Sequence, residues 1–359
     1  MKKLISIVII IATIFCFSGC INSSESDNSV SEATQKETSS VESKEEKKAD
    51  DRRSAIEVKG DKYPLTINDY FDKKTVLNTA PKRVAVLAGS QLNIWYDLGG
   101  KSICTSDISK NLKILSGCEE EFKSLPSVGA VYKVNMESII ALKPDLIITQ
   151  VGSQNPVSEE LSKMGYPVLS VNLRSYEDVL DTYRAFGKIL QNEKIANEKI
   201  NAIKKQRADL LSKKPEKDKS VVVLYLTSKS LSVKLDNSIA GDVCKGLGLK
   251  NISSDLPPDT IGSESTPLDI EYIVQQNPDY VLVTSMISNN EAAVKTMNKQ
   301  FEENPAWKGV KAVQEGRVAY LPQEYFLYNA GPYYCEAIEY VARSVYPDIY
   351  GKVDKWYGK

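Results

Sequence analysis

One pattern occurs twice in this sequence, and it limits the possible folds more than any other feature. In each copy a glutamate stands seven residues before a Pro-Asp pair. The glutamates are Glu137 and Glu271, and the pairs begin at Pro144 and Pro278. Apolar residues recur at helical spacing around each glutamate, and an apolar run of strand length follows each pair. Because proline ends a helix, each copy predicts a short helix, a stop and a buried strand.

The separation of the two copies, 134–150 and 268–285, predicts how the chain is divided. One helix–strand unit in each half favours two similar α/β lobes over a stacked solenoid. Asn192–Lys214 lies midway, is rich in helix formers and would span about 33 Å at about 1.5 Å per residue. We expect this helix to join the lobes. The alternative is two unrelated helix–strand units that share a common turn.

The start of the chain predicts where the protein acts. Lys2 and Lys3 precede an apolar run over 4–17, which is typical of a secretory signal and short for a membrane span. The next residues, FSGC at 17–20, resemble the bacterial lipobox, with Phe17 where leucine is usual. This resemblance implies a signal peptide over 1–19 and a lipid on Cys20 that anchors the protein outside the cell membrane. An uncleaved anchor helix would give the same topology.

The segment that follows is too polar to fold. Between 21 and 53 the residues are mainly Ser, Glu, Lys, Asp and Thr, so little apolar surface is available to offset the entropy of ordering. We expect a disordered tether over 20–55. The remaining chain is long enough for two cores, and we divide it into an N-terminal lobe (56–190), a linking helix (191–215) and a C-terminal lobe (216–359).

Charge and cysteine usage exclude some classes of protein. The formal net charge is -1 and the isoelectric point is about 5.9, so a nucleic-acid partner is not expected. No CxxC motif supports a zinc ribbon or a redox site. Beyond Cys16 and the lipidated cysteine, two pairings are open, Cys104 with Cys118 and Cys244 with Cys335, and four free buried thiols are the alternative.

Polar residues at strand ends are candidates for ligand binding. A predicted strand over 83–88 leads through Ser90 and Gln91 into an amphipathic helix, at the edge where open α/β sheets bind ligands. Gly89 is a lone glycine, so neither a dinucleotide fingerprint nor a P-loop is present. In the first repeat Tyr132 and Lys133 precede the helix and Gln150 follows the strand; in the second, Met286 follows the strand. We expect these residues to face a ligand.

An aromatic segment near the C-terminus is a further candidate. Residues 323–334, QEYFLYNAGPYY, look too polar and broken for a core, which predicts that their rings are exposed for binding. Ordinary packing beneath a loop is equally compatible with the pattern. The rings belong to Tyr325, Phe326, Tyr328 and Tyr333.

Several blocks together carry a family resemblance that extends from about Pro64 to the end of the chain. They are PKRVAVL (81–87), LPSVGAVYKVNMESIIALKPDLII (125–148), the second glutamate repeat and NPAWKGVKAVQEGRVAYLP (304–322). With the lipobox and tether, they resemble the substrate-binding lipoproteins of ABC importers for iron–siderophores, haem and cobalamin. The resemblance implies an α/β fold with two Rossmann-like lobes joined by a single long helix, the class III periplasmic-binding-protein fold. It also implies a protein that closes only slightly on one ligand, with an ABC permease and ATPase as partners. We expect a monomer.

In that family the glutamate of each repeat docks into an arginine pocket of the permease, which implies this role for Glu137 and Glu271. Two carboxylates on separate rigid lobes would orient the protein and speed its encounter with the permease. Without the repeat, each glutamate would be an ordinary solvated charge.

The ligand is constrained by which side chains the sequence lacks. It contains no histidine, which removes histidine-rich zinc and manganese sites and the commonest haem ligand. Tyrosine and methionine also bind haem iron, and the resemblance to haem-binding lipoproteins aligns Tyr132 and Met286 with the two axial positions. No intrinsic cofactor is expected.

Cationic side chains are scarce near the expected cleft. Only Arg174 is expected to reach it, with Lys133 and Lys229 as helpers, and this disfavours a strongly anionic siderophore. A neutral hydroxamate, a corrinoid or a haem suits the composition better. The aromatic residues expected to recognise such a ligand are Trp95, Tyr132, Tyr225 and those of the segment 323–334.

An enzyme is not expected, because the chain has no GxSxG motif, no histidine and no tight carboxylate pair. The sequence instead predicts a protein that captures an iron chelate, either a hydroxamate-type siderophore or haem, and delivers it to a permease. A cobalamin-binding importer lipoprotein, or a surface sensor with the same fold, is the alternative.

Overall fold

The computed structural model describes residues 56–217, 219–260 and 262–353. The expected signal peptide (1–19), Cys20 and the tether (20–55) lie outside these residues. Within the described ranges, no helix is both long enough and apolar enough to cross a membrane.

The first lobe contains a buried parallel sheet with strand order β4-β7-β8. A smaller antiparallel sheet, β1-β2-β3, packs beside α5, and its strands β2 and β3 form a hairpin. The elements are β1 (Glu57–Lys59), β2 (Leu65–Asn68), β3 (Lys74–Leu77), β4 (Val84–Val86), α1 (Gly89–Asp97), α2 (Glu119–Ser124), β5 (Gly129–Ala130), β6 (Lys133–Val134), α3 (Met136–Ala141), β7 (Leu146–Gln150), α4 (Asn155–Lys163), β8 (Val168–Val171) and α5 (Tyr176–Ile189).

The second lobe repeats this plan, with parallel strands in the order β9-β13-β14. It adds the antiparallel strands β10 and β12 on the other side of β9, while the short strand β11 also pairs with β9. The elements are β9 (Ser220–Leu226), β10 (Leu231–Lys234), α7 (Ile239–Gly246), β11 (Lys250–Asn251), β12 (Ser265–Pro267), α8 (Ile270–Gln276), β13 (Tyr280–Ser285), α9 (Asn290–Glu303), η1 (Pro305–Gly309), α10 (Lys311–Gln314), β14 (Val318–Tyr320), α11 (Gln323–Phe326), η2 (Gly331–Tyr333), α12 (Tyr334–Val345) and α13 (Pro347–Tyr350).

The sequence repeat is confirmed as two copies of one local structure. Asn135 caps α3 and Asp269 caps α8, each by accepting a hydrogen bond from the backbone N–H three residues later. The residue before each proline has a left-handed backbone conformation, with φ of 49° at Lys143 and 43° at Asn277. This left-handed residue stands at the same point of each repeat, although α8 extends one residue closer to its proline than α3 does.

The aspartate of each Pro-Asp pair accepts hydrogen bonds from the backbone at the start of the neighbouring strand. Asp145 accepts hydrogen bonds from the backbone N–H groups of Lys82 and Arg83, which lead into β4. Asp279 accepts one from the backbone N–H of Ser220, the first residue of β9. The repeated Pro-Asp pair thus stops a helix and also fixes the start of the adjacent parallel strand.

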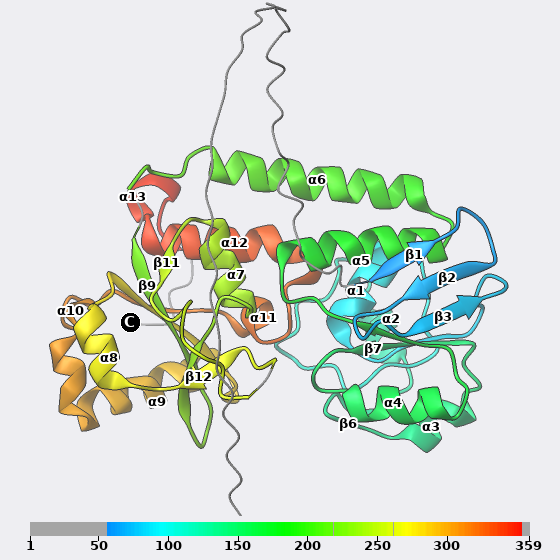
Figure 1. Cartoon of the computed structure of the whole chain (residues 1–359), viewed down its shortest axis with the longest axis horizontal. Helices are drawn as coiled ribbons and strands as arrows, with labels where there is room; N and C mark the ends of the chain where they lie inside the picture. Colours follow the sequence, from blue (N-terminus) through cyan, green and yellow to red (C-terminus); the bar gives the residue numbers. More distant parts are fainter. Residues whose placement is uncertain (1–55, 218, 261, 354–359) are drawn as a thin grey trace, which may run out of the picture. The chain divides into compact units, whose positions relative to one another are not determined.

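The lobes are connected by the long helix α6 (Glu193–Leu211), whose 19 residues span about 28 Å at about 1.5 Å per residue. This is shorter than the 33 Å expected, because the helix ends at Leu211 and residues 212 and 213 form a turn. α6 runs alongside α5 of the first lobe and α12 (Figure 1). It buries Ala196, Ile200 and Ile203 and leaves its other faces largely to solvent.

The largest apolar core is shared by both lobes. It joins Val86 and Leu180 of the first lobe, Ile203 of α6, and Val223 and Val341 of the second lobe. A smaller core cluster lies within the second lobe, around β13 and η1. The lobes are therefore connected by close packing as well as by the chain, which favours small relative movements.

A tight turn joins β9 to β10, because the backbone N–H of Thr227 donates to the carbonyl of Ser230 and β10 begins at Leu231. The aromatic segment 323–334 is largely helical, forming α11, η2 and the start of α12.

The cysteines described by the structure are all free thiols, so neither of the two pairings occurs. Burial raises the pKa of both Cys104 and Cys335 to about 11, which keeps these thiols protonated at neutral pH. Cys244 is completely buried, and its pKa is raised further. These three cysteines act as small apolar core residues.

Candidate functional site

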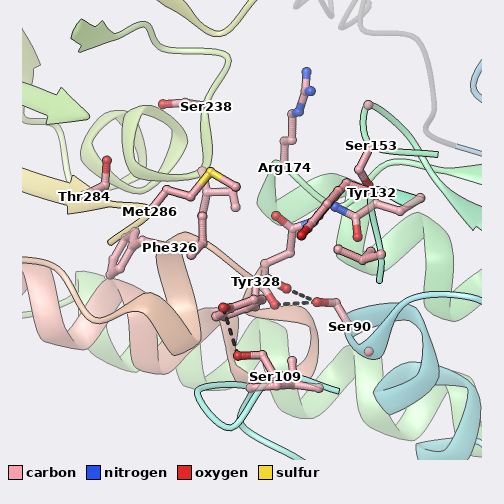
Figure 2. Close-up of a pocket in the computed structure, with 18 of the residues that line it drawn as sticks. Ser90, Ser109, Tyr132, Ser153, Arg174, Ser238, Thr284, Met286, Phe326 and Tyr328 are labelled. Atoms are coloured by element: carbon pink, nitrogen blue, oxygen red, sulfur yellow. Dashed lines mark hydrogen bonds between the residues drawn. The ribbon is translucent and has the colours of Figure 1, made fainter. Parts of the chain in front are cut away.

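A cavity of about 600 Å³ lies where the carboxyl ends of the two parallel sheets face each other. This volume falls within the usual range for small-molecule sites. The residues that follow β4, β7 and β8 line one side, and the ends of β9 and β13 line the other. Both lobes contribute side chains to it (Figure 2).

Most of the residues expected from the sequence to bind ligand do line this cavity. They come from polar turns after strands, from the tip of the β5–β6 hairpin and from the aromatic segment. They are Ser90, Tyr132, Gln150, Arg174, Tyr225, Met286, Phe326 and Tyr328.

Gln91 and Trp95 lie in the core instead, so we remove them from the candidate site. They are four residues apart on α1, on the face that packs inward. The Trp95 indole N–H donates to the carbonyl of Lys101 at 3.1 Å, and its ring packs edge-on against Phe186. The Gln91 side chain donates to the carbonyl of Val171 at 3.4 Å.

Two lysines expected to help bind ligand also lie off the cavity wall. Lys133 is exposed on β6 and does not line the cavity, whereas its neighbour Tyr132, in the turn before β6, does. Lys229 is exposed in the turn between β9 and β10. We remove both from the candidate site.

Tyr325 and Tyr333 bind a residue of the other lobe rather than lining the cavity. Their rings lie 5.5 and 4.3 Å from the ammonium group of Lys113. That lysine also pairs with Glu336, and the Tyr325 hydroxyl donates to the same carboxylate at 2.7 Å. The role we assign to these two rings is therefore to join the lobes.

The floor of the cavity is a second contact between lobes. The Ser90 hydroxyl donates to the carbonyls of Tyr328 and Asn329, and the Ser109 hydroxyl donates to the Tyr328 hydroxyl at 2.9 Å (Figure 2). Residues 106–112 were not predicted to belong to the site, because this segment has no regular periodicity. Residues 106–112 join the site through contacts with the other lobe, such as the one between Ser109 and Tyr328.

Two exposed apolar side chains face the cavity from opposite lobes. Tyr132 is 71 % exposed and Met286 is 56 % exposed, although large apolar groups are usually covered. Tyr225 lies beside Met286, and its hydroxyl donates to the Met286 sulfur at 3.3 Å. Burial, with the nearby carboxylate of Glu264, raises the pKa of Tyr225, so this hydroxyl stays neutral. Such walls suit a ligand with apolar faces.

Three of the charged residues of the cavity wall form an ion-paired trio: Arg174, Lys234 and Glu264. Only Arg174 was expected from the sequence. Lys234 and Glu264 were missed because strands β10 and β12, which bring them together, were not recognised. The alternation of Leu231, Val233 and Leu235 with polar residues is the signal that could have revealed β10.

Comparison with known proteins decides the family. Residues 84–325 match the family described as periplasmic binding protein. The chain belongs to this family. Members bind solutes for ABC importers and are not enzymes, so the expected class of protein is confirmed, as is its α/β fold of two lobes joined by a single long helix.

Relatives of this periplasmic binding protein include two proteins of Bacillus subtilis. The Fe(3+)-citrate-binding protein YfmC is 30% identical over 70% of this chain and 76% of its own length. The ABC transporter substrate-binding lipoprotein YvrC is 26% identical over 84% of this chain and 92% of its own length. Among solved structures, S. aureus IsdE complexed with heme has a TM-score of 0.63 at 20% identity, covering 74% of this chain and 98% of that one, which supports the fold.

Glu137 and Glu271 occupy the same position of equivalent helices in this periplasmic binding protein. Each is exposed and is the second residue of its helix, α3 or α8. Tyr132 precedes one glutamate by five residues and Glu264 precedes the other by seven, and both of these line the cavity. The two carboxylates therefore lie within a few residues of the ligand site, one on each lobe.

Proposed function

We propose that this periplasmic binding protein is the extracytoplasmic substrate-binding component of an ABC importer, that it captures an iron chelate in the cavity between its lobes, and that it delivers the chelate to the permease. The lipid on Cys20 would keep the protein at the outer face of the cell membrane, where it works as a monomer with a permease and an ATPase. The chelate is a hydroxamate-type siderophore or haem.

The observation that carries this proposal is the composition of the cavity wall. Rings and a thioether face the ligand from both lobes, and charged groups are confined mainly to the ion-paired trio. Within the described residues, no cluster of three His, Cys, Asp or Glu side chains could hold a bare metal ion. Iron would therefore enter within an organic chelator, whose apolar parts pack against Tyr132 and Met286.

The names of its relatives agree with this class of ligand. YfmC is named for binding Fe(3+)-citrate, and IsdE has been solved with haem. Haem would suit the walls because it is flat and apolar, with carboxylates at one edge for Arg174. The Tyr132 oxygen and the Met286 sulfur are candidate ligands of its iron from opposite lobes.

Substitution of Tyr132 tests haem as the cargo. In Tyr132→Ala we expect a Soret band that is lost or much weakened after haem is added, because both the iron ligand and a stacking ring are removed. Tyr132→Phe is the matched control, since it removes only the hydroxyl. Haem ligation predicts that the Phe variant also has a shifted Soret band. If the wild-type protein binds a ferric hydroxamate tightly and shows no Soret band with haem, the cargo is the siderophore.

We also propose Glu137 and Glu271 as the carboxylates that dock on the permease. Their matched positions on two rigid lobes support a two-point contact that is guided by charge. Small movements between the lobes on ligand binding would then change the separation of the two contacts.

A further inference from the structure

The ion-paired trio crosses from one lobe to the other. Arg174 follows β8 in the first lobe, whereas Lys234 and Glu264 belong to the second. One carboxylate serves both cations. Its Oε2 lies 3.3 Å from Arg174 Nε, and its Oε1 lies 2.5 Å from Lys234 Nζ. Because the side chains are only 10 to 29% exposed, these charges are poorly screened by solvent.

Lys234 serves to neutralise Glu264. The register of β10 and β12 pairs Lys234 with Ser265, the residue after Glu264. Lys234 is 10% exposed, and its ammonium lies between the Glu264 carboxylate and the ring of Tyr225, 4.1 Å from the ring centroid. This ammonium is therefore already engaged on two sides, and its charge is largely balanced by Glu264.

Arg174 has a free edge for a ligand. Glu264 engages only its Nε, and the structure records no partner for the two terminal nitrogens within the described part of the chain. Figure 2 shows the guanidinium extending from the ribbon away from the labelled side chains. A Cβ added at Gly152 would lie 3.4 Å from Nη2, so glycine leaves room beside this edge. A free guanidinium edge matches one carboxylate through two parallel hydrogen bonds.

The other charged residue of the wall is Asp107, which is exposed and accepts a hydrogen bond from the Ser127 hydroxyl at 2.5 Å. Solvent screens this carboxylate more than it screens the trio. The trio carries two positive charges and one negative charge, so its net charge is one positive charge. This positive charge is located at the two terminal nitrogens of Arg174, which Glu264 does not engage.

We propose that Glu264 is a specificity residue that limits the negative charge accepted by the cavity. It cancels one of the two cations, so the cavity balances one carboxylate-type group of a ligand and disfavours polyanionic chelates. This inference rests on the proposed function for the class of ligand, an iron chelate. It adds the charge of that chelate and the residue that selects it.

Substitution by the neutral isostere tests this role. Affinities of wild-type protein and Glu264→Gln are measured by titration calorimetry with ferric citrate, which is anionic, and with ferrioxamine B, which carries no net negative charge. We expect Glu264→Gln to bind ferric citrate about tenfold or more tightly than wild type and to bind ferrioxamine B within about twofold of wild type. Asp107→Asn is the matched control. It makes the same charge change on the same wall and should strengthen ferric citrate binding by less than about threefold.

The opposite result would overturn the proposal. If Glu264 serves only to orient Arg174, Glu264→Gln will weaken ferric citrate binding as Arg174→Gln does. If Glu264→Gln and Asp107→Asn strengthen ferric citrate binding equally, the gain comes from the change in net charge. Glu264 then has no special role.

A titration with citrate alone tests the role of Glu264 even if neither ferric chelate binds. Citrate is added to protein labelled with ¹⁵N-arginine, and the Nε–H signal of Arg174 is assigned by its absence in Arg174→Lys. We expect this signal to shift with citrate in wild-type protein, and at about tenfold lower citrate in Glu264→Gln. No shift in either protein, or the same midpoint in both, would contradict the charge limit. Failure of both ferric chelates to bind would count against the proposed function alone.

Discussion

Changing Glu137 and Glu271 together to alanine is expected to reduce chelate uptake by the intact importer at least about tenfold and to leave chelate affinity unchanged. Both carboxylates are exposed in the first turns of equivalent helices, so their removal should not disturb either lobe. At an interface, loss of one member of a charge pair costs about 2 kcal/mol or more of binding free energy. One such loss already weakens binding to the permease by more than about tenfold. Each single variant should retain part of the uptake, because the other lobe can still dock.

The matched control removes two exposed glutamates from other helices. Glu198 on α6 and Glu302 on α9 give the same change of net charge away from the repeats. Uptake of a radioactive iron chelate into cells carrying each pair of substitutions separates a specific docking role from a general effect of charge. Equal uptake in the Glu137/Glu271 variant and wild type would remove these residues from the docking surface.

Gly241→Ala is expected to lower the free energy of unfolding by about 3 kcal/mol. The glycine lies in α7, close to the chain that enters this helix. A Cβ at this position would lie 2.2 Å from the carbonyl oxygen of Leu235 and 2.6 Å from the Cα of Asp236. Both are backbone atoms, so the clash can be relieved only by moving the helix. Since Ser238–Ala240 line the cavity, the movement should also weaken ligand binding.

Gly246→Ala provides the control in the same helix. Its added Cβ would lie 3.6 Å from Arg207 Nη2, an ordinary contact with a side chain, so we expect stability within about 1 kcal/mol of wild type. Urea unfolding followed by circular dichroism gives both values. If Gly241→Ala were as stable as Gly246→Ala, α7 would not pack as closely on residues 235–236 as the structure indicates.

The sequence predicted those parts of the fold that depend on local signals. The prolines that end α3 and α8 and the apolar strands that follow them are encoded within about fifteen residues of each repeat glutamate. Because the same signals occur twice, two equivalent lobes could be predicted without a known structure. The ligand-facing turns followed from the rule that α/β sheets bind at the carboxyl ends of their strands.

The parts that were missed depend on tertiary pairing. Trp95 was expected at the ligand, but the rotation of α1 places its ring in the core. Lys234 and Glu264 are 30 residues apart and meet only through the pairing of β10 with β12. The aromatic segment was ambiguous because its residues divide two roles: Phe326 and Tyr328 line the cavity, whereas the neighbouring Tyr325 binds a lysine of the other lobe. No local pattern specifies such partners.

An iron chelate in the cavity can be identified by what the purified protein retains. Protein lacking residues 1–55 is exposed separately to haem, cobalamin and ferric hydroxamates, and is then desalted. Its absorption spectrum and native mass are recorded. We expect one molecule of haem or of a ferric hydroxamate per chain. Retention of cobalamin alone, or of none of these compounds, would contradict the proposal of an iron chelate.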